Sequence, residues 1–479
     1  MISEEMVAAL SMPGGPRRVT SSIPGPKARE IIERTSKYEA PTFLMAGSPV
    51  VYAGGKGSII EDPDGNRFVD LWVGRTAATV GIGHPKVVDA IIEQTQKQTY
   101  AADGQTDVRS RVVEKINSIL PANLKDNSKI ILSFSGSQAN EIAVRMAMKA
   151  TGRSGVVTFS GSYHGVWGLA WEFSGSTRAR QMRWGQRSTP THFMPYPSTY
   201  RPAFGPTASG DDIHGDYLEY MLTRETSGVD DIACVIVETI QDDGYASPPP
   251  GWFKRLRAIC DKIGAVLICD EVLSGLGFTG KMWALEHHGV EPDIVTIGKG
   301  LGGTLPMSAV AIHERFCAKA FEGVAAPNGG MGNPITCAAA LATLDLITDP
   351  ALELVKRAGE IGADTRKQVE DFARTSKIIG DIRIEGLMCI IELVRDQESK
   401  EPVASGRIAG SVLNRIILGS QENSLLSQGY LYRVSGVHKN CIKWMPSLTV
   451  PRALMRESTQ ALLDALGENE KALIQENVH

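Results

Sequence analysis

Between residues 130 and 312 the sequence contains short apolar runs, rich in β-branched residues and separated by stretches with helical spacing. The runs are 130–134, 156–159, 233–238, 265–270, 294–297 and 308–312. Such runs predict buried strands, because a strand covered on both faces needs apolar residues at successive positions. Strands that alternate with helices in this way predict an α/β fold with a mostly parallel, mixed sheet and helices on both of its faces. We expect any ligand to bind at the C-terminal ends of these strands.

Two of the runs lead into residues with distinctive chemistry. Asp270 ends one run, and Lys299 follows the next, between glycines in 298–303. A lysine with small neighbours can form a Schiff base with a carbonyl if burial or nearby cations lower its pKa. Pyridoxal phosphate needs such a lysine, together with an acid that keeps its ring nitrogen protonated. Taken singly, an aspartate at a strand end is more often a cap, and a lysine is usually solvated. Together the two residues suggest a Schiff-base enzyme, with pyridoxal phosphate as the candidate cofactor.

The other predicted strand ends carry compatible residues. Gly136 and Ser137 open a predicted helix, where backbone N–H groups and the helix dipole could hold a phosphate. Tyr163 could lie against a cofactor ring, and Glu238 would face the ligand crevice. Each also has an ordinary structural explanation, as a glycine turn, a packing aromatic or a helix cap. Lys299 cannot belong to a nucleotide-binding P-loop, because Gly300 follows it and Asp293 stands where the first glycine of that motif belongs.

Composition excludes several other classes of protein. The chain of 479 residues is 42% hydrophobic and 22% charged, with dispersed basic residues and a net charge of −4, which argues against a nucleic-acid surface. The apolar runs are shorter than the roughly 20 residues that a membrane helix needs, and the N-terminus lacks a secretory signal pattern. Seven scattered cysteines without a CxxC pair indicate a reduced, cytoplasmic protein. The histidines form no HExxH motif, so we expect no metal site.

The remaining sequence predicts a second, smaller domain built from both ends of the chain. Residues 1–25 are rich in Pro, Gly and Ser and are expected to lie along the surface, before a helix over 25–38 and a β-meander that ends near residue 74. After a long helix that begins near Ala338, residues 379–394 predict a hairpin in an α+β region. We expect residues 1–79 to join this small domain, 80–345 to form the large cofactor domain, and 346–479 to form the rest of the small domain.

Several motifs, in their order and spacing, resemble the class III aminotransferases, pyridoxal-phosphate enzymes of fold type I. They are residues 270–272, 279–282, 286–296, 298–303 and 332–342, and the resemblance extends from about residue 20 to 460. It implies that Lys299 forms the Schiff base and that Asp270 binds the pyridine nitrogen. It also implies that Val272 and Tyr163 enclose the ring and that Gly136 and Ser137 hold the phosphate. Segment 332–342 is similar to one that reaches the neighbouring subunit's cofactor, so the resemblance implies a homodimer with shared active sites.

The sequence departs from the family pattern close to the cofactor. Gln138 stands where the family usually has Glu, and Leu273 stands where Gln is common, which removes one polar contact. Gly329 occupies the position of a threonine that usually touches the phosphate across the dimer. We therefore expect phosphate binding to involve Asn328 or the backbone at Gly329.

The largest departure concerns the substrate. Lys443 stands where many aminotransferases have an arginine that binds the substrate carboxylate, and lysine lacks the two-pronged geometry of a guanidinium. Losing one of two charge-assisted hydrogen bonds, each worth about 1.5–3 kcal/mol, could cost roughly tenfold or more in affinity. Arg75 falls where the family places a substrate-facing residue, close to Trp72. We expect Arg75, Lys443 and Trp72 to contact the substrate, with Arg75 as a replacement anchor.

Two reactions remain open at this point. Segments 150–156, 194–202 and 380–387 resemble a branch of the family that contains isoleucine epimerase and α-amino-ε-caprolactam racemase. Asp243 stands where those racemases carry Asp and many transaminases carry Glu. Amino transfer needs one base, Lys299, whereas racemisation benefits from a second acid/base on the opposite face, for which Asp243 is a candidate. We favour transamination, with racemisation as the alternative. A non-catalytic paralogue is disfavoured because Lys299 and Asp270 occur together.

Overall fold

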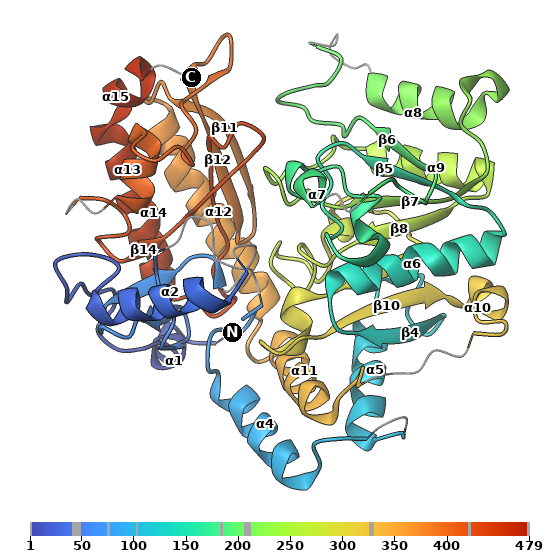
Figure 1. Ribbon diagram of the computed structural model, residues 1–479, viewed down its shortest axis with the longest axis horizontal. Coiled ribbons are helices and arrows are strands. Elements are labelled where there is room, and N and C mark those ends of the chain that lie inside the picture. The colour runs from blue at the N-terminus through green and yellow to red at the C-terminus, as the bar shows by residue number, and fades with distance from the viewer. Residues whose placement is uncertain are drawn as a thin grey trace. The chain divides into compact units, whose positions relative to one another are not determined.

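The computed structural model describes residues 2–40, 49–73, 77–101, 104–182, 185–205, 212–324, 330–419 and 423–476. The chain divides into two compact units. Unit 1 consists of Met1–Pro85 with Leu346–His479, and unit 2 is the continuous segment Lys86–Asp345. Figure 1 shows an extended sheet with its helices in each unit. In the described ranges, no helix has both the length and the apolarity needed to cross a bilayer.

Unit 2 is built on a seven-stranded sheet with the strand order β4-β10-β9-β8-β7-β5-β6. Its strands are β4 (Ser128–Ser133), β5 (Gly155–Phe159), β6 (Thr191–Met194), β7 (Ile232–Glu238), β8 (Val266–Asp270), β9 (Ile294–Ile297) and β10 (Ser308–His313). Only β10 runs antiparallel to its neighbours, β4 and β9. The predicted α/β fold with a mostly parallel, mixed sheet is confirmed.

The helices of unit 2 begin and end where the sequence favours it. Ser135 caps the N-terminus of α6 (Gly136–Thr151), and Gly152 ends it in the left-handed conformation, with a φ of 72°. The other helices are α4 (Pro85–Lys97), α5 (Asp107–Ile119), α7 (Thr177–Gln181), α8 (Ile213–Thr223), α9 (Trp252–Ile263), α10 (Glu314–Ala320) and α11 (Pro334–Thr348). Short 3₁₀ turns are η1 (Gly168–Trp171), η2 (Glu225–Ser227), η3 (Ala284–His287) and η4 (Lys299–Gly302).

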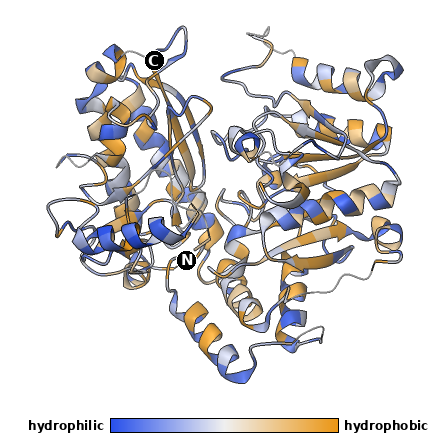
Figure 2. Cartoon of the chain, in the orientation of Figure 1, coloured by the Kyte–Doolittle hydropathy of each residue, from blue (hydrophilic) through white to orange (hydrophobic). Residues whose placement is uncertain are grey.

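The core of unit 2 lies between α6 and the sheet. Ala143 and Ala147 of α6 pack against buried residues of β7, including Cys234 and Ile236. Side chains alternate along a strand, so the intervening valines of β7 face the opposite side, and α9 also packs on β7 and β8. In Figure 2 the strands of this sheet are mainly hydrophobic, as expected for a sheet covered on both faces. All seven cysteines of the chain are buried and unbridged.

Unit 1 joins the two ends of the chain in two sheets. The first has the order β1-β2-β3-β14, with strands β1 (Gly54–Lys56), β2 (Ile59–Glu61), β3 (Arg67–Asp70) and β14 (Tyr430–Leu431). The second contains β11 (Ile379–Glu385), β12 (Met388–Asp396), β13 (Glu401–Pro402), β15 (Arg433–Ser435) and β16 (Cys441–Trp444). Its helices are α1 (Glu4–Ala9), α2 (Pro26–Tyr38), α12 (Leu354–Ala373), α13 (Val412–Leu418), α14 (Arg452–Glu468) and α15 (Glu470–Gln475). The predicted meander and the β11–β12 hairpin are both present.

The expectation that residues 1–25 only lie along the surface is wrong for the first turn of the chain. Helix α1 buries Val7 completely, and the Glu4 carboxylate accepts a 2.8 Å hydrogen bond from the guanidinium of Arg357. Arg357 is fully buried in α12 and also donates to the carbonyl oxygens of Leu448 and Val450. A buried guanidinium needs a partner of this kind, and its partner here is distant in sequence.

Candidate active site

The C-terminal ends of the parallel strands bring most of the predicted site residues in unit 2 to one edge of the sheet. Asp270 ends β8, Glu238 ends β7, and Lys299 follows β9 after a single glycine. Strands β7, β8 and β9 are adjacent and parallel, with Glu238 paired directly beside Asp270 in the ladder. These three side chains therefore belong to one crevice, as expected for an open α/β sheet.

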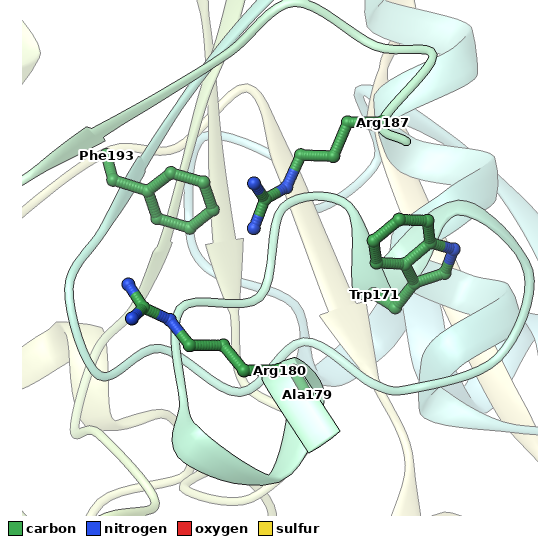
Figure 3. A pocket seen from close by; sticks show the side chains of 5 residues that line it. All are labelled: Trp171, Ala179, Arg180, Arg187 and Phe193. Atoms are coloured by element: carbon green, nitrogen blue, oxygen red, sulfur yellow. The ribbon is translucent and has the colours of Figure 1, made fainter. Parts of the chain in front are cut away.

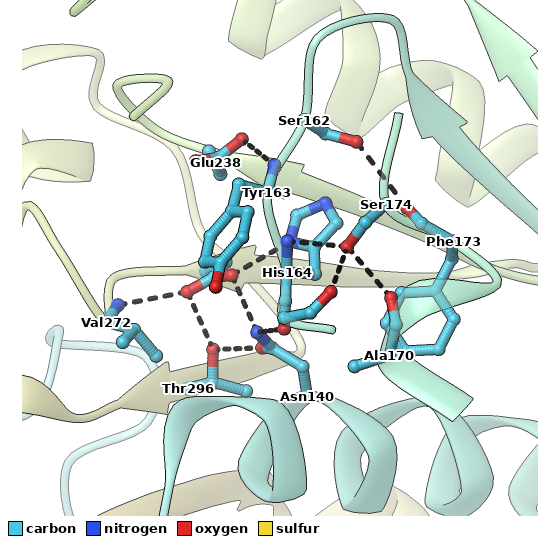
Figure 4. Close-up of polar contacts among 12 residues, drawn as sticks. Asn140, Ser162, Tyr163, His164, Ala170, Phe173, Ser174, Glu238, Val272 and Thr296 are labelled. Carbon is cyan, nitrogen blue, oxygen red and sulfur yellow. Dashed lines mark hydrogen bonds and ion pairs between the residues drawn. The ribbon is translucent and has the colours of Figure 1, made fainter. Parts of the chain in front are cut away.

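Asp270 is the most completely organised of these residues. Its carboxylate is 5% exposed and accepts 2.8 Å hydrogen bonds from the side chains of Asn140 and His164. The backbone N–H of Val272 donates at 3.0 Å, and the hydroxyl of Thr296 lies at 3.3 Å. In Figure 4, Asn140, His164 and Thr296 approach from three different elements: α6, the turn after β5, and β9.

This network keeps Asp270 ionised. Burial by itself would raise the pKa of its carboxyl group, but the hydrogen bond and charge of His164, the Val272 N–H and the charge of Lys299 together lower that pKa below its usual value. Asn140 is held in one orientation, because its amide group also donates to the His164 carbonyl and accepts from Thr296. The result is a fixed anion at the end of β8, suited to keeping a ring nitrogen protonated.

Glu238 and Glu271 are held differently. The Glu238 oxygens accept hydrogen bonds from the backbone N–H groups of Tyr163 and Asp242, which fixes the turns after β5 and β7. Burial and the nearby charge of Asp270 raise the pKa of Glu238 well above its ordinary value. Glu271 is buried, and burial raises its pKa to about 7. Its carboxylate accepts hydrogen bonds from Thr239, Ser274 and the N–H groups of Ala284 and Leu285. Glu271 thereby anchors the loop that carries Val272.

The N-terminus of α6 offers donors for an anion. Ser135 accepts a hydrogen bond from the N–H of Gln138, and the Gln138 side chain accepts one from the N–H of Phe134 at 2.9 Å. This reciprocal arrangement is close to a capping box, and an amide does it without adding a negative charge. The N–H groups of Gly136 and Ser137 belong to the same first turn, where the helix dipole favours an anion by roughly 0.3–1 kcal/mol.

Close packing brings this helix end against the other predicted site residues. A Cβ on Gly136 would lie 2.8 Å from Cγ1 of Val272, so only glycine allows this approach. Gly165, with a φ of 127°, sets the turn that carries Tyr163 against Ser137, and any side chain there would collide with the Ser137 hydroxyl. The crevice at Asp270 is therefore surrounded by backbone N–H groups that can donate hydrogen bonds to a phosphate, by the half-buried ring of Tyr163 and by the half-buried side chain of Val272. This combination fits pyridoxal phosphate.

Lys299 has an unusual backbone for its position. Its φ of 44° lies in the left-handed region, which costs a non-glycine residue about 1–2 kcal/mol. Gly298 precedes it, and a Cβ there would lie 2.9 Å from Val272. The lysine is thus held in a strained turn next to the predicted ring site. Such strain is often found at functional positions.

The other predicted residues are placed as follows. Asp243 is half-buried in the loop after β7, which is closed by a 2.9 Å hydrogen bond from the Gln241 N–H to the Ala246 carbonyl. Lys443 and Trp72 lie together in unit 1, with the ammonium 4.4 Å from the centroid of the indole ring. Arg75, Asn328 and Gly329 lie outside the described residues. No group of three or more potential metal ligands occurs in the described part of the chain.

The sequence analysis did not identify the residues that support Asp270. His164 was part of the predicted turn, but only Tyr163 was given a role there. Thr296 is the polar member of the otherwise apolar strand β9, which was a visible signal. Asn140 follows Gly136 by four positions and therefore lies on the same side of α6, although nothing in the sequence connects it with Asp270.

Comparison with known proteins points to one family. The aminotransferase class-III family matches residues 45–466. An alanine/serine racemase from Pyrococcus horikoshii is 32% identical over 92% of this chain and 91% of its own length. A diaminobutyrate–2-oxoglutarate aminotransferase from Rhizobium meliloti is 31% identical over 87% of this chain and 88% of its own. Among solved structures, taurine:2-oxoglutarate aminotransferase from Bifidobacterium kashiwanohense, in complex with pyridoxal phosphate and glutamate, matches with a TM-score of 0.82 and 25% identity. That match covers 95% of this chain and all of the other.

Proposed function

The chain belongs to the class III aminotransferases, pyridoxal-phosphate-dependent enzymes that move amino groups, and we propose that Lys299 and Asp270 carry this chemistry here. The proposed reaction transfers an amino group from an amino acid or amine to a 2-oxo acid. The observation that supports it most is the buried, ionised Asp270 at the end of β8, next to the strand that leads into Lys299. When bound, the cofactor supplies a ring that withdraws electrons from the reacting carbon.

Each protein group has a distinct task in this proposal. Gly136 and Ser137 bind the phosphate, and Tyr163 and Val272 orient the ring from its two faces. Asp270 would accept a hydrogen bond from the protonated ring nitrogen, and its negative charge would keep that proton in place. Lys299 would hold the cofactor through its side-chain amine and, once the amino group of the substrate has replaced it there, would move a proton on one face of the substrate carbon.

A second candidate reaction is racemisation, which Asp243 and the racemase relative favour. Racemisation returns the proton to the opposite face of the carbon and therefore needs a second proton donor. Asp243 lies in the loop after β7, whose end is fixed when Glu238 accepts the Asp242 N–H at 2.9 Å. A carboxyl group held in this way could serve as that donor.

We propose Lys443, Trp72 and Arg75 as substrate-binding residues. The Lys443 side chain is 5% exposed and lies over the face of Trp72, a cation–π contact that limits its movement. A buried ammonium of this kind can pair with a substrate carboxylate as a point charge.

Asn328 and Gly329 are proposed as phosphate contacts on the basis of the family resemblance alone. By the same resemblance the enzyme is proposed to be a homodimer with shared active sites, and its buried, unbridged cysteines suit the cytoplasm.

Single enantiomers of amino acids, amino amides and amines, incubated with and without a 2-oxo acid, test the reaction. Amino transfer that requires the oxo acid supports transamination, whereas loss of chirality without it supports racemisation. Lys299→Ala should abolish either reaction, while Lys281→Ala, at an exposed lysine, should leave it unchanged. Asp243→Asn should suppress racemisation selectively. Retention of full activity by Lys299→Ala would refute the proposed site.

A further inference from the structure

Two glutamates of unit 2, Glu172 and Glu271, are almost completely buried, with exposed fractions of 3% and 1%. Burial of a carboxylate is unfavourable unless hydrogen bonds replace those that it made with water. Both side chains meet this requirement, because each accepts hydrogen bonds from residues more than ten positions away in the chain. The two carboxylates hold different parts of unit 2, and only one of those parts belongs to the proposed cofactor site.

Glu172 holds a loop beside a cavity of about 270 Å³. Its carboxylate accepts hydrogen bonds from the N–H groups of residues 188–189 and from the first hydroxyl of that pair. Arg187 precedes them, and Figure 3 shows its guanidinium between the rings of Phe193 and Trp171, which line the cavity. The distances to the two ring centroids are 4.8 and 6.0 Å. Glu172 thus stabilises a region where a side chain of the protein itself covers the rings.

Glu271 holds the turn that follows β8. One of its carboxylate oxygens accepts hydrogen bonds from the Thr239 hydroxyl at 2.7 Å and from the Leu285 N–H at 2.8 Å. The other accepts from the Ser274 hydroxyl at 2.7 Å and from the Ala284 N–H at 3.2 Å. The four donors occupy the acceptor sites of both oxygens. Because they come from the end of β7, from the turn itself and from η3, this one carboxylate joins three segments.

The residue after Glu271 lies between two parts of the proposed cofactor site. A Cβ on Gly136, in the phosphate-binding turn, would lie 2.8 Å from Cγ1 of Val272. A Cβ on Gly298, which precedes Lys299, would lie 2.9 Å from the same methyl group. The isopropyl group of Val272 therefore lies close to the backbone of both turns. Any shift of the backbone at Glu271 would move this group relative to them, because the two residues are adjacent.

From this geometry we propose that Glu271 is a positioning residue for the cofactor and acts through Val272. Its carboxylate fixes the backbone of the turn, so that the isopropyl group stays between the phosphate-binding turn and the turn of Lys299. Glu271 is buried whereas Val272 is half-buried, so the carboxylate acts from inside the fold and the valine faces the crevice. This inference rests on the proposed function, because it concerns the cofactor that Lys299 and Asp270 are proposed to use.

Glu271→Gln tests the proposal in the holoenzyme. The amide keeps the size of the side chain, but its NH2 group cannot accept the hydrogen bonds that the replaced oxygen accepted. The dissociation constant of pyridoxal phosphate, measured by equilibrium dialysis, should rise about tenfold or more. The absorption spectrum of the bound cofactor should change as well, because the ring is held differently. Glu172→Gln is the matched control: it should lower the free energy of unfolding comparably and leave the affinity and the spectrum unchanged.

Val272→Ala shows whether the effect passes through the valine. Residues that act through one another have non-additive effects, so Glu271→Gln should change the dissociation constant much less when Val272→Ala is also present. Its effect on the free energy of unfolding should be the same in both backgrounds. If Glu271→Gln does not fold, Thr239→Val replaces it in this cycle. That change removes one donor, keeps the shape of the side chain and should weaken cofactor binding about two- to tenfold.

Three results would overturn the proposal. One is a folded Glu271→Gln enzyme with the affinity and spectrum of the wild type. Another is an equal loss of affinity with and without Val272→Ala, because the carboxylate would then not act through the valine. The third is an equal loss of affinity in Glu172→Gln, which would show a general effect of stability. A wild-type enzyme that binds no pyridoxal phosphate would instead refute the proposed function itself.

Discussion

Asp270 and Asp293 are two buried aspartates at opposite ends of the same pair of strands. Asp270 ends β8, and Asp293 immediately precedes β9 and accepts a 2.8 Å hydrogen bond from the Leu267 N–H of β8. They are 5% and 2% exposed. Their partners differ in charge. Asp293 pairs with the guanidinium groups of Arg257, at 3.0 Å, and Arg315, whereas Asp270 is held by an amide, an imidazole, a hydroxyl and a backbone N–H.

By our proposal, this difference separates an anion that stabilises the fold, Asp293, from one that acts on a ligand, Asp270. At Asp293 two permanent cations neutralise the carboxylate, so little of its charge remains for another group. At Asp270 an amide, a hydroxyl, a backbone N–H and an imidazole fix the carboxylate, and no guanidinium is paired with it. Burial is nearly equal at the two positions, so burial alone does not identify a functional carboxylate. What differs between the two positions is the paired guanidinium groups, which are present at Asp293 and absent at Asp270.

The largest expected effect is a loss of stability on substitution of Asp293. Asp293→Ala leaves the Arg257 guanidinium, which is 16% exposed, without its buried partner, and breaking such a pair costs about 3–5 kcal/mol. We expect this loss in the free energy of unfolding measured in urea, with turnover per folded molecule unchanged. Asp261→Ala removes the other, 60% exposed partner of Arg257 and should cost less than about 1 kcal/mol. Equal losses in the two variants would show that burial at Asp293 does not matter.

Asp270→Asn should affect turnover more than it affects stability. It preserves the size of the side chain and removes its charge, so turnover at saturating cofactor should fall by roughly 10²–10³-fold. The loss in stability should be smaller than for Asp293→Ala, because Asp270 has no guanidinium partner and the asparagine can still accept hydrogen bonds from its neighbours. Turnover and thermal unfolding of both variants check this. The comparison fails if Asp270→Asn unfolds the protein while its folded fraction keeps full activity.

His164→Ala tests whether a single partner of Asp270 matters individually. A hydrogen bond to a charged group is worth about 1.5–3 kcal/mol, so turnover or cofactor affinity should fall roughly ten- to a hundredfold. His192→Ala, on the edge strand β6, is the control and should have little effect. His164→Gln, which can still donate a hydrogen bond, should recover part of the loss. A His164→Ala enzyme with wild-type kinetics and absorption spectrum would remove His164 from the network.

The smallest effect concerns pH. The pKa of Asp270 is lower in the folded chain than its ordinary value of 3.8, so its ionised form stabilises the fold above that value. This contribution is lost as the pH falls through the folded-state pKa. The difference in melting temperature between wild type and Asp270→Asn should therefore narrow as the pH falls from about 5 to below the ordinary value. A difference that is independent of pH would contradict the depressed pKa.

The sequence predicted the strands and the two residues at their ends because both depend on local patterns. Apolar runs specify β7, β8 and β9, and a polar residue at the end of each run is visible without a structure. The partners of Asp270 could not be predicted in this way, because Asn140 and His164 come from elements more than 100 residues away in the chain. Their contact depends on strand order, which the alternation of strands and helices does not specify.

Unit 1 shows the same limit more clearly. The composition of residues 1–25 suggests a surface segment, yet Glu4 pairs with the buried Arg357 and with Arg452. A charged residue in a short amphipathic segment is ordinarily solvated, and only the burial of Arg357 gives it a structural role. That Asp270 and Glu238 lie at the same edge of the sheet was predictable, by contrast, because both end strands of one parallel sheet.

The contact between Glu4 and Arg357 also has a consequence for how the chain is made on the ribosome. Unit 2 is continuous, so all of its residues have been synthesised by residue 345, and it can fold while the rest of the chain is still being added. Glu4 is among the first residues made, yet Arg357 and Arg452 are made hundreds of residues later. Helix α1 must therefore wait for its partners during most of translation. Completion of unit 1 is thus the last step in the folding of the single chain.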